Sequence, residues 1–165
     1  MTEIFSTIAF YTFGILAVGG AVGMVTARRL VHGALFLVLS FLSVAAIYLL
    51  AGADFLAGVQ LLIYAGAIMI LMLFAIMLTP GQIEVARPGQ RKQRLGAALV
   101  AVSFLVVAVY SLLGTDWPLA QTLAYRPTTE TIGELLLSGY VLPFELASVL
   151  LLAAMVGAIL VARED

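Results

Sequence analysis

Residues 58–74, GVQLLIYAGAIMILMLF, are apolar enough to lie in a membrane but carry a tyrosine and a glycine near their middle. Tyrosine in a membrane-spanning helix usually lies at the water interface, where its hydroxyl stays hydrated. Tyr64 instead lies at mid-span and is followed by three small residues, Ala65, Gly66 and Ala67. Any account of this chain must explain that placement.

The amino-acid composition indicates which solvent surrounds the folded chain. Hydrophobic residues form 64% of the 165 residues and charged residues only 10%, whereas soluble domains carry about 25% charged residues. A soluble fold could not cover this much apolar surface, so the lipid bilayer must be the solvent. The lack of cysteine excludes disulfides, a thiol nucleophile and Cys-ligated iron–sulfur clusters within the chain. A net charge of −1 gives no reason to expect nucleic acid as a partner.

Hydropathy predicts an all-α integral membrane protein that forms one membrane domain over residues 1–165. A spanning helix needs about 20 mostly apolar residues, and none of the apolar segments shows the alternation expected of a barrel strand. The predicted spans are 4–25, 30–50, 55–78, 95–113 and 140–162. Short turns between the first three spans predict antiparallel neighbours. The connection before the last span is long enough for a surface helix, within which 119–123 and 132–137 are apolar.

Basic residues predict the orientation of the chain, because loops rich in Lys and Arg stay in the cytoplasm. With five spans, only Arg126 lies on one side of the membrane. The other side holds Arg28, Arg29, Arg87, Arg91, Lys92, Arg94 and Arg163. We therefore expect a multi-pass protein of the cell membrane with its N-terminus outside and its C-terminus in the cytoplasm.

Few side chains in the predicted spans could carry chemistry. His32, the only histidine, has no acidic residue or second histidine at ligand spacing, which favours an interfacial residue over a metal ligand. Asp54 directly precedes the third span and is predicted to be its N-cap. Glu145 follows Pro143 near the start of the last span, where the helix dipole favours a carboxylate. The alternative for Glu145 is a role in proton movement or subunit contact, because acids just inside the interface are often functional.

Two interpretations of Tyr64 follow from the residues around it. Gln60 and Tyr64 are four residues apart and share a helix face, and the small residues nearby allow another helix to approach. Tyr64 would then lie in a tight helix contact that satisfies its hydroxyl. Alternatively, the tyrosine and Gly66 mark an irregular turn such as a π-bulge, which often occurs at functional sites. The methionines that follow are adaptable packing residues.

Three stretches resemble subunit J of the proton-pumping NADH:quinone oxidoreductase, respiratory complex I, the bacterial counterpart of its sixth mitochondrially encoded subunit. They are GVQLLIYAGAIMILMLFAIML (58–78), RRLVHGALFLVLSFLSVAAIYLL (28–50) and GYVLPFELASVLLLAAMVGAILVARED (139–165), about 70 of the 165 residues. The first span and the connection before the last span carry no distinctive match. The resemblance implies five spans with the N-terminus outside, in agreement with the topology predicted from hydropathy and charge.

The resemblance implies a coupling role, with enzymatic activity only as part of a complex and no catalytic residue in this chain. Members bind no cofactor themselves, because NADH, FMN, iron–sulfur clusters and quinone belong to other subunits. The expected partners are the lipid bilayer and the other membrane subunits of complex I, especially the small ones next to the quinone chamber. The third helix of the family is thought to switch between α-helical and π-bulged forms and to gate a hydrated path.

Carried onto this chain, the switch implies a set of coupling and gating residues in the third span. These are Tyr64, Ala65, Gly66, Met69, Met72 and Phe74. Gln60 and Glu145 are the candidates for a proton path or a subunit contact. Gln60 departs from some bacterial relatives, which have glutamate there. Because glutamine cannot release a proton, no carboxylate-based proton step is assigned to Gln60.

Other classes of protein remain open at this point. Membrane-bound hydrogenases, ferredoxin- or F420-linked complexes and multisubunit cation antiporters contain similar small subunits. A purely structural scaffold subunit is a further alternative, and it predicts that variants of Tyr64 and Gly66 which assemble will function normally. A free-standing transporter is disfavoured, because the chain lacks paired intramembrane charges and interrupted helices at repeated positions.

Overall fold

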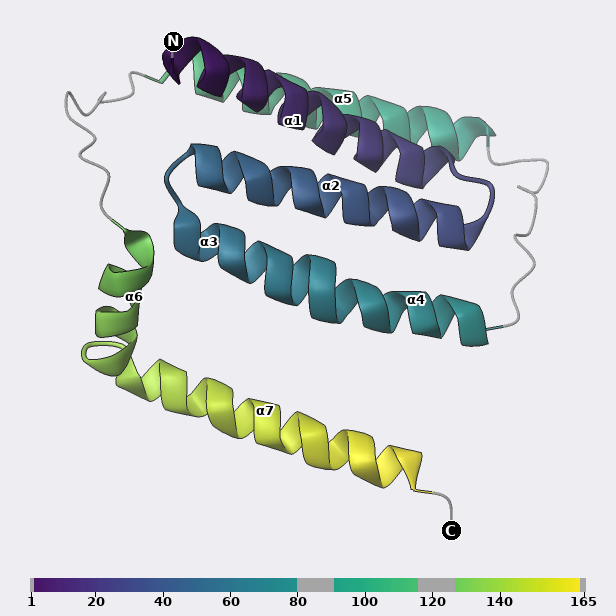
Figure 1. Ribbon diagram of the computed structural model, residues 1–165. Coiled ribbons are helices and arrows are strands. Elements are labelled where there is room, and N and C mark those ends of the chain that lie inside the picture. The colour runs from purple at the N-terminus through teal and green to yellow at the C-terminus, as the bar shows by residue number, and fades with distance from the viewer. Residues whose placement is uncertain (1, 80–90, 116–126, 164–165) are drawn as a thin grey trace.

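The computed structural model describes residues 2–79, 91–115 and 127–163, and within these ranges every element is helical (Figure 1). The elements are α1 (Thr2–Thr26), α2 (Leu30–Leu50), α3 (Asp54–Val59), the π-helix η1 (Gln60–Ile68), α4 (Met69–Leu78), α5 (Arg91–Leu113), α6 (Thr128–Leu137) and α7 (Val141–Ala162). The predicted segment 119–123, Arg87 and Arg126 lie outside the described residues.

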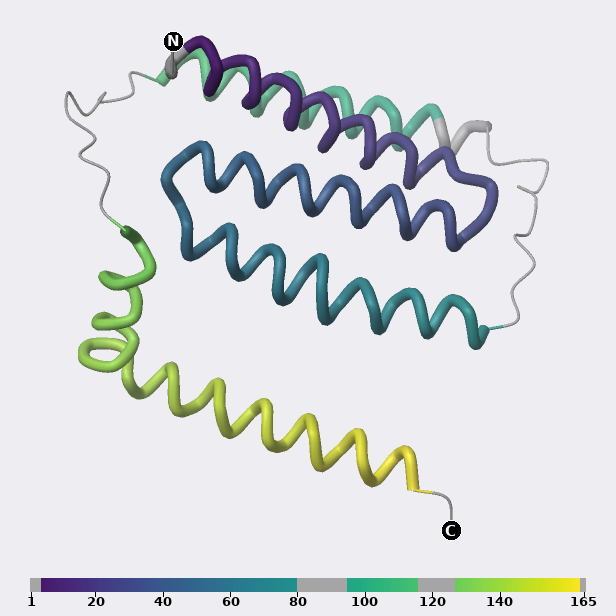
Figure 2. Tube along the Cα trace, in the orientation of Figure 1, coloured from purple at the N-terminus to yellow at the C-terminus, as the bar shows by residue number. Residues whose placement is uncertain are grey.

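Among the described residues, five helices are long and apolar enough to cross a membrane, which confirms the predicted all-α membrane fold. They are Ile4–Thr26, Leu30–Leu50, Asp54–Leu78, Leu95–Leu113 and Val141–Ala162. The third span consists of α3, η1 and α4, and the Cα trace runs through it as one continuous helix (Figure 2). Its two junctions keep ordinary helical backbone angles, so the change of helix type does not break the span.

The first three spans form an antiparallel layer with α2 in the middle (Figure 1). α2 contacts α1 on one side and α3, η1 and α4 on the other. The turn from α2 to α3 takes three residues, of which Gly52 has a φ of 74°. This left-handed conformation suits glycine because it has no Cβ. The antiparallel arrangement predicted from the short turns is confirmed.

Small residues bring α1 and α2 close together. The Ser40 hydroxyl on α2 donates a hydrogen bond of 3.0 Å to the Ala17 carbonyl oxygen on α1. A Cβ added at Gly20 would lie 2.8 Å from the Phe36 carbonyl oxygen and 2.9 Å from the Ser40 amide nitrogen. Only glycine fits between these two backbones. Close backbone approach and a polar contact across it are the usual basis of helix association in a membrane.

α5 and α7 stand apart from this three-helix layer. α5 lies behind α1 in Figure 1 but contacts none of the other described helices. Within the described chain, α7 contacts only α6, which in turn contacts the start of the third span through α3. No residue of α7 is buried. These two spans therefore leave nearly all of their apolar surface for lipid or for other proteins.

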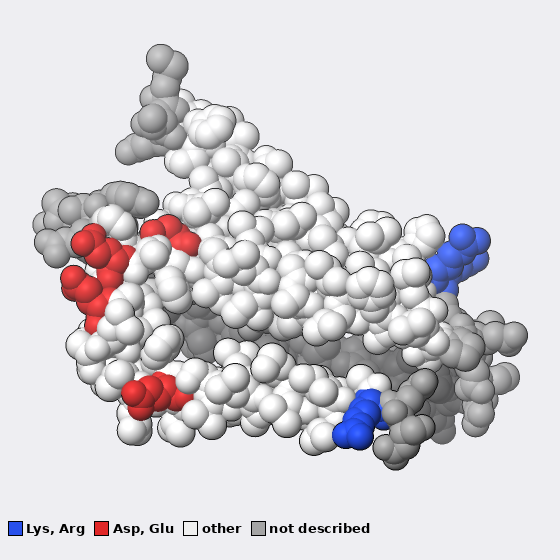
Figure 3. Space-filling view, turned by 60° about the horizontal axis from the view of Figure 1, so that its bottom comes forward, with Lys and Arg blue, Asp and Glu red and all other residues white. Residues whose placement is uncertain are grey.

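Acidic and basic residues lie at opposite ends of the described structure (Figure 3). Asp54 lies at the end of the layer where α2 turns into α3, and Glu130, Glu134 and Glu145 lie on α6 and early in α7. The opposite end carries Arg28 and Arg29 in the turn between α1 and α2, and Arg163 just after α7. The two faces of the predicted membrane protein therefore differ in charge.

Replacing Gly20 with alanine should weaken the contact between α1 and α2. The added Cβ meets backbone atoms of Phe36 and Ser40, and overpacking of this kind costs about 1–3 kcal/mol. We expect a lower melting temperature and less subunit in membranes, measured by thermal inactivation and immunoblot. Gly19→Ala is the matched control, because a Cβ there meets nothing within 4 Å. Equal stability of the two variants would contradict this account of the interface.

Candidate functional site

The only described π-helix, η1, covers residues Gln60–Ile68 and contains Tyr64, Ala65 and Gly66. The amide of Met69, directly after η1, donates to the carbonyl oxygen of Tyr64, five residues earlier. A π-helix forms such five-residue hydrogen bonds in place of the four-residue bonds of an α-helix, and it usually marks a functional segment. The irregular turn considered for this stretch is therefore present, and it is longer than the three residues inferred from the sequence.

The π turns change which side chains face α2. Gln60 is 8% exposed and Met69 is 1% exposed, and α2 is the only described helix outside the third span that contacts η1 or α4. In a regular α-helix, residues nine apart lie on opposite faces, because each residue turns by about 100°. The extra residue in η1 lets both side chains face α2, while Ile68 is 45% exposed. A regular α-helix would turn Met69 to the side opposite Gln60 and would bring Ala67, seven residues after Gln60, closest to the face on α2.

Tyr64 contacts α2 through its ring. The Phe41 and Tyr64 ring centroids lie 5.6 Å apart at an interplanar angle of 71°, an edge-to-face arrangement that aromatic pairs prefer. Tyr64 remains 44% exposed, so this chain covers only part of the side chain. The helix contact considered for Tyr64 thus exists, but the residue is not buried by this chain.

Gly66 is placed where a side chain would crowd the π turn. A Cβ built on Gly66 would lie 3.2 Å from the Leu61 carbonyl oxygen, five residues earlier. That distance is tighter than nine in ten Cβ contacts, and the atom that the Cβ would meet belongs to the backbone of η1 itself. Glycine is therefore better suited than alanine to this position in the π form.

The remaining predicted residues lie at different depths. Met72 is half-buried and Phe74 is 58% exposed on α4. Glu145 is the fifth residue of α7 and exposed, which places it beyond the first turn. The dipole effect falls off within the first turn, so the dipole explains the position of Glu145 less well than the sequence suggested. His32 is exposed, and no group of three His, Cys, Asp or Glu residues among the described side chains could hold a metal ion.

Asp54 corrects one prediction from the sequence. α3 has Ala53 at its N-cap and no side-chain cap, so Asp54 does not cap its own helix. Its carboxylate instead accepts hydrogen bonds from the amide of Thr128 at 2.9 Å and from the hydroxyl of Thr129 at 2.8 Å, at the start of α6. The local sequence gave no sign of this partner, which lies 74 residues away.

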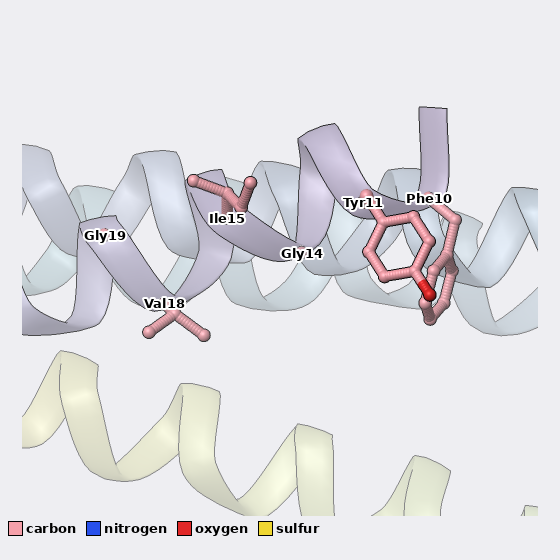
Figure 4. A pocket seen from close by; sticks show the side chains of 6 residues that line it. All are labelled: Phe10, Tyr11, Gly14, Ile15, Val18 and Gly19. Atoms are coloured by element: carbon pink, nitrogen blue, oxygen red, sulfur yellow. The ribbon is translucent and has the colours of Figure 1, made fainter. Parts of the chain in front are cut away.

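A separate apolar recess of about 540 Å³ lies along α1 (Figure 4). It is lined by Phe10, Tyr11, Gly14, Ile15, Val18 and Gly19. In Figure 4, Phe10 and Tyr11 lie at one end of the row and Gly19 at the other. All six residues come from α1, and none belongs to the third span, so this recess is not part of the η1 site.

Comparison with known proteins identifies the family. Residues 20–161 match the family of NADH-ubiquinone/plastoquinone oxidoreductase chain 6, and this range includes η1 and all the predicted site residues. The chain belongs to this family. The resemblance to subunit J of complex I seen in the sequence is thereby confirmed.

Individual relatives are similar to this chain along most of their length. NAD(P)H-quinone oxidoreductase chain 6 of Synechocystis sp. is 42% identical over 160 residues, covering 96% of this chain and 81% of the relative. Its counterpart in Nostoc sp. is 41% identical, with 93% and 79% covered. F(420)H(2) dehydrogenase subunit J of Methanosarcina mazei is 39% identical, with 93% and 90% covered.

Gly66→Ala should shift the third span of this chain 6 protein from the π form to the α form. In the π form the alanine Cβ would lie 3.2 Å from the Leu61 carbonyl oxygen, so the substitution disfavours the π turn. We expect cryo-EM maps of the assembled complex to show more α-helix at residues 60–68, with Met69 turned away from α2.

Gly58→Ala is the control for this substitution, because a Cβ at Gly58 in the α-helical part of the same span meets nothing within 4 Å. It should leave η1 unchanged. An unaltered π-helix in the Gly66→Ala complex would show that crowding at Leu61 does not select the helix type.

Proposed function

We propose that this chain is a membrane-arm subunit of an NADH:quinone oxidoreductase, in which it supports the coupling of quinone reduction to proton translocation. The observation that carries the proposal is the π-helix η1, which lies in a chain of the chain 6 family and contains Tyr64 and Gly66. The relatives are named as subunits of quinone oxidoreductases or of a dehydrogenase. Catalysis and the cofactors NADH, FMN, iron–sulfur clusters and quinone are assigned to other subunits.

η1 acts as a conformational gate in this proposal. Removing one inserted residue from η1 on conversion toward a regular α-helix rotates the side chains beyond it by about 100° relative to those before it. Met69 then leaves the face on α2, while Met72 and Phe74 turn with it. A water-filled path that runs beside α4 opens or closes as these bulky side chains move.

Protons would cross this region on water, with Tyr64 as the polar side chain at mid-span. Its hydroxyl can both donate and accept a hydrogen bond, and 44% of the residue is open to a neighbouring subunit or to water. Gln60 can bind water at the start of η1 but cannot release a proton. Glu145 is exposed early in α7, where it suits a contact with a partner subunit or a proton path through that partner.

The charges support the proposed orientation in the membrane. Arg28, Arg29 and Arg163 lie at the end of the molecule opposite Asp54, and positive residues favour the cytoplasm. The N-terminus then faces outward and the C-terminus inward, across the cell membrane. Small membrane subunits beside the quinone chamber are the partners for the exposed faces of α5 and α7.

A second candidate function differs from the first in its electron donor. A relative of similar identity is a subunit of F(420)H(2) dehydrogenase, and the donor would bind to a subunit other than this chain. An F420-linked complex would use the same η1 gate with a different donor module. A purely structural scaffold role does not require a π-helix.

Co-purification tests the assignment. The chain, tagged in its own membrane and extracted in mild detergent, should co-purify with a large assembly that oxidises NADH and reduces quinone. Mass spectrometry identifies the subunits, and activity with NADH or reduced F420 identifies the donor. Recovery of the chain alone, or with hydrogenase or antiporter subunits, would contradict the proposed function while leaving the five-span fold intact.

Tyr64→Phe should lower the number of protons moved per electron while leaving assembly and quinone reduction largely unchanged. The phenylalanine keeps the ring contact with Phe41 but removes the hydroxyl, and a hydrogen bond of about 1 kcal/mol shifts the population of a connected water path by about fivefold. The ratio is measured in proteoliposomes. Tyr110→Phe, an exposed position on α5, is the control, and equal ratios in both variants would rule out a role for the Tyr64 hydroxyl.

A further inference from the structure

The first residues of α3 and α6 cap each other's helices. Beyond the hydrogen bonds from Thr128 and Thr129 to Asp54, the Thr128 hydroxyl also donates to the Asp54 carboxylate. The same hydroxyl accepts a hydrogen bond of 3.2 Å from the amide of Phe55, near the start of α3. We call this set of hydrogen bonds among Asp54, Phe55, Thr128 and Thr129 the double cap.

Neither helix caps itself. α3 begins after Ala53 and α6 begins after Pro127, and neither of these residues makes a side-chain cap. The first amides of a helix have no partner within the helix and need an acceptor from elsewhere. In the double cap, Asp54 supplies the acceptor for α6 and Thr128 supplies the acceptor for α3. Separating the two helices would therefore leave both helix starts without their caps.

The double cap fixes only one end of the third span. α6 contacts α3 and α7 but no other described helix, so it does not reach η1 or α4. At the other end of the span, Met77 is 69% exposed and Leu78 is 80% exposed. The start of the span is held by side-chain hydrogen bonds to α6, whereas the Thr79 hydroxyl at its far end donates to the Ala75 carbonyl oxygen within the same span.

A change of helix type in η1 rotates α3 and α4 relative to each other, but it does not determine which of the two moves. Which half moves depends on which half is held. We propose that Asp54 and Thr128 are positioning residues for the gate: the double cap holds α3 still, so that the rotation produced in η1 appears in α4. This inference rests on the proposed function, because it assigns a fixed end to the proposed gate.

The test begins with the wild-type complex and needs no variant. Cryo-EM structures are determined for the resting complex and for the complex during turnover, with decylubiquinone as acceptor and NADH or reduced F420, as co-purification decides, as donor. The inference expects an intact double cap and a stationary α3 in both structures, with Met69, Met72 and Phe74 rotated between them. A rotated α3 beside a stationary α4, or a broken double cap, would overturn it.

Different results would contradict the gate in η1 and the positioning role of the double cap. If η1 has the same helix type in both structures, the gate itself is wrong and the positioning role is lost with it. If η1 changes type while α3 rotates, the gate stands and only the positioning role is wrong.

Variants then test whether the double cap affects coupling. Thr128→Val removes the hydroxyl but keeps the backbone amide, and Asp54→Asn keeps the size of the side chain but removes its charge. Losing a hydrogen bond to a charged group lowers the occupancy of the capped arrangement by about tenfold or more. Among complexes that assemble, we expect a partial loss of protons moved per electron, near-normal quinone reduction and a displaced α3. Thr128→Ser should restore all three properties.

Thr131→Val is the matched control, because it makes the same change at an exposed residue of α6 that takes no part in the double cap. It should leave the proton-to-electron ratio unchanged. A wild-type ratio in the assembled Thr128→Val and Asp54→Asn complexes would show that the double cap only stabilises the fold. If both variants fail to assemble, the wild-type structures still decide between a fixed and a moving α3.

Discussion

The structure depends on the need to satisfy every backbone amide and carbonyl group inside a solvent that offers no hydrogen bonds. A membrane helix can change the direction of its side chains only if its backbone bonds remain paired. η1 meets this condition by pairing each amide one residue further back, as the bond from Met69 to Tyr64 shows. The third span thereby keeps Gln60 and Met69 on the same side without breaking the helix.

The rest of the fold places α2 beside this segment. Gly20 and Ser40 hold α2 tightly against α1, so α2 presents a well-supported surface to the third span. Phe41 on that surface contacts Tyr64. A rotation of α4 therefore takes place against a neighbour that is itself held in place by α1, and the departure of Met69 changes the side-chain shape that faces α2.

Most of the fold could be predicted from the sequence, because spans of about 20 apolar residues and turns of a few residues leave little freedom in a membrane. The irregular turn was also foreseeable, since Tyr64 and Gly66 are unusual at mid-span and their surroundings resemble a known family. The pairing of Asp54 with Thr128 was not, because an aspartate before a helix resembles an ordinary cap and its partner is distant in sequence. Phe41 was missed because it resembles every other apolar residue of α2.

The isolation of α5 and α7 has a consequence for the life of the protein in the cell. A chain whose described residues leave two spans without a neighbouring span gains stability when other chains cover those spans, so its folding free energy is shared with its assembly. We expect the lifetime of the subunit in the membrane to depend on the supply of its partner chains, because incompletely folded protein is removed by proteases.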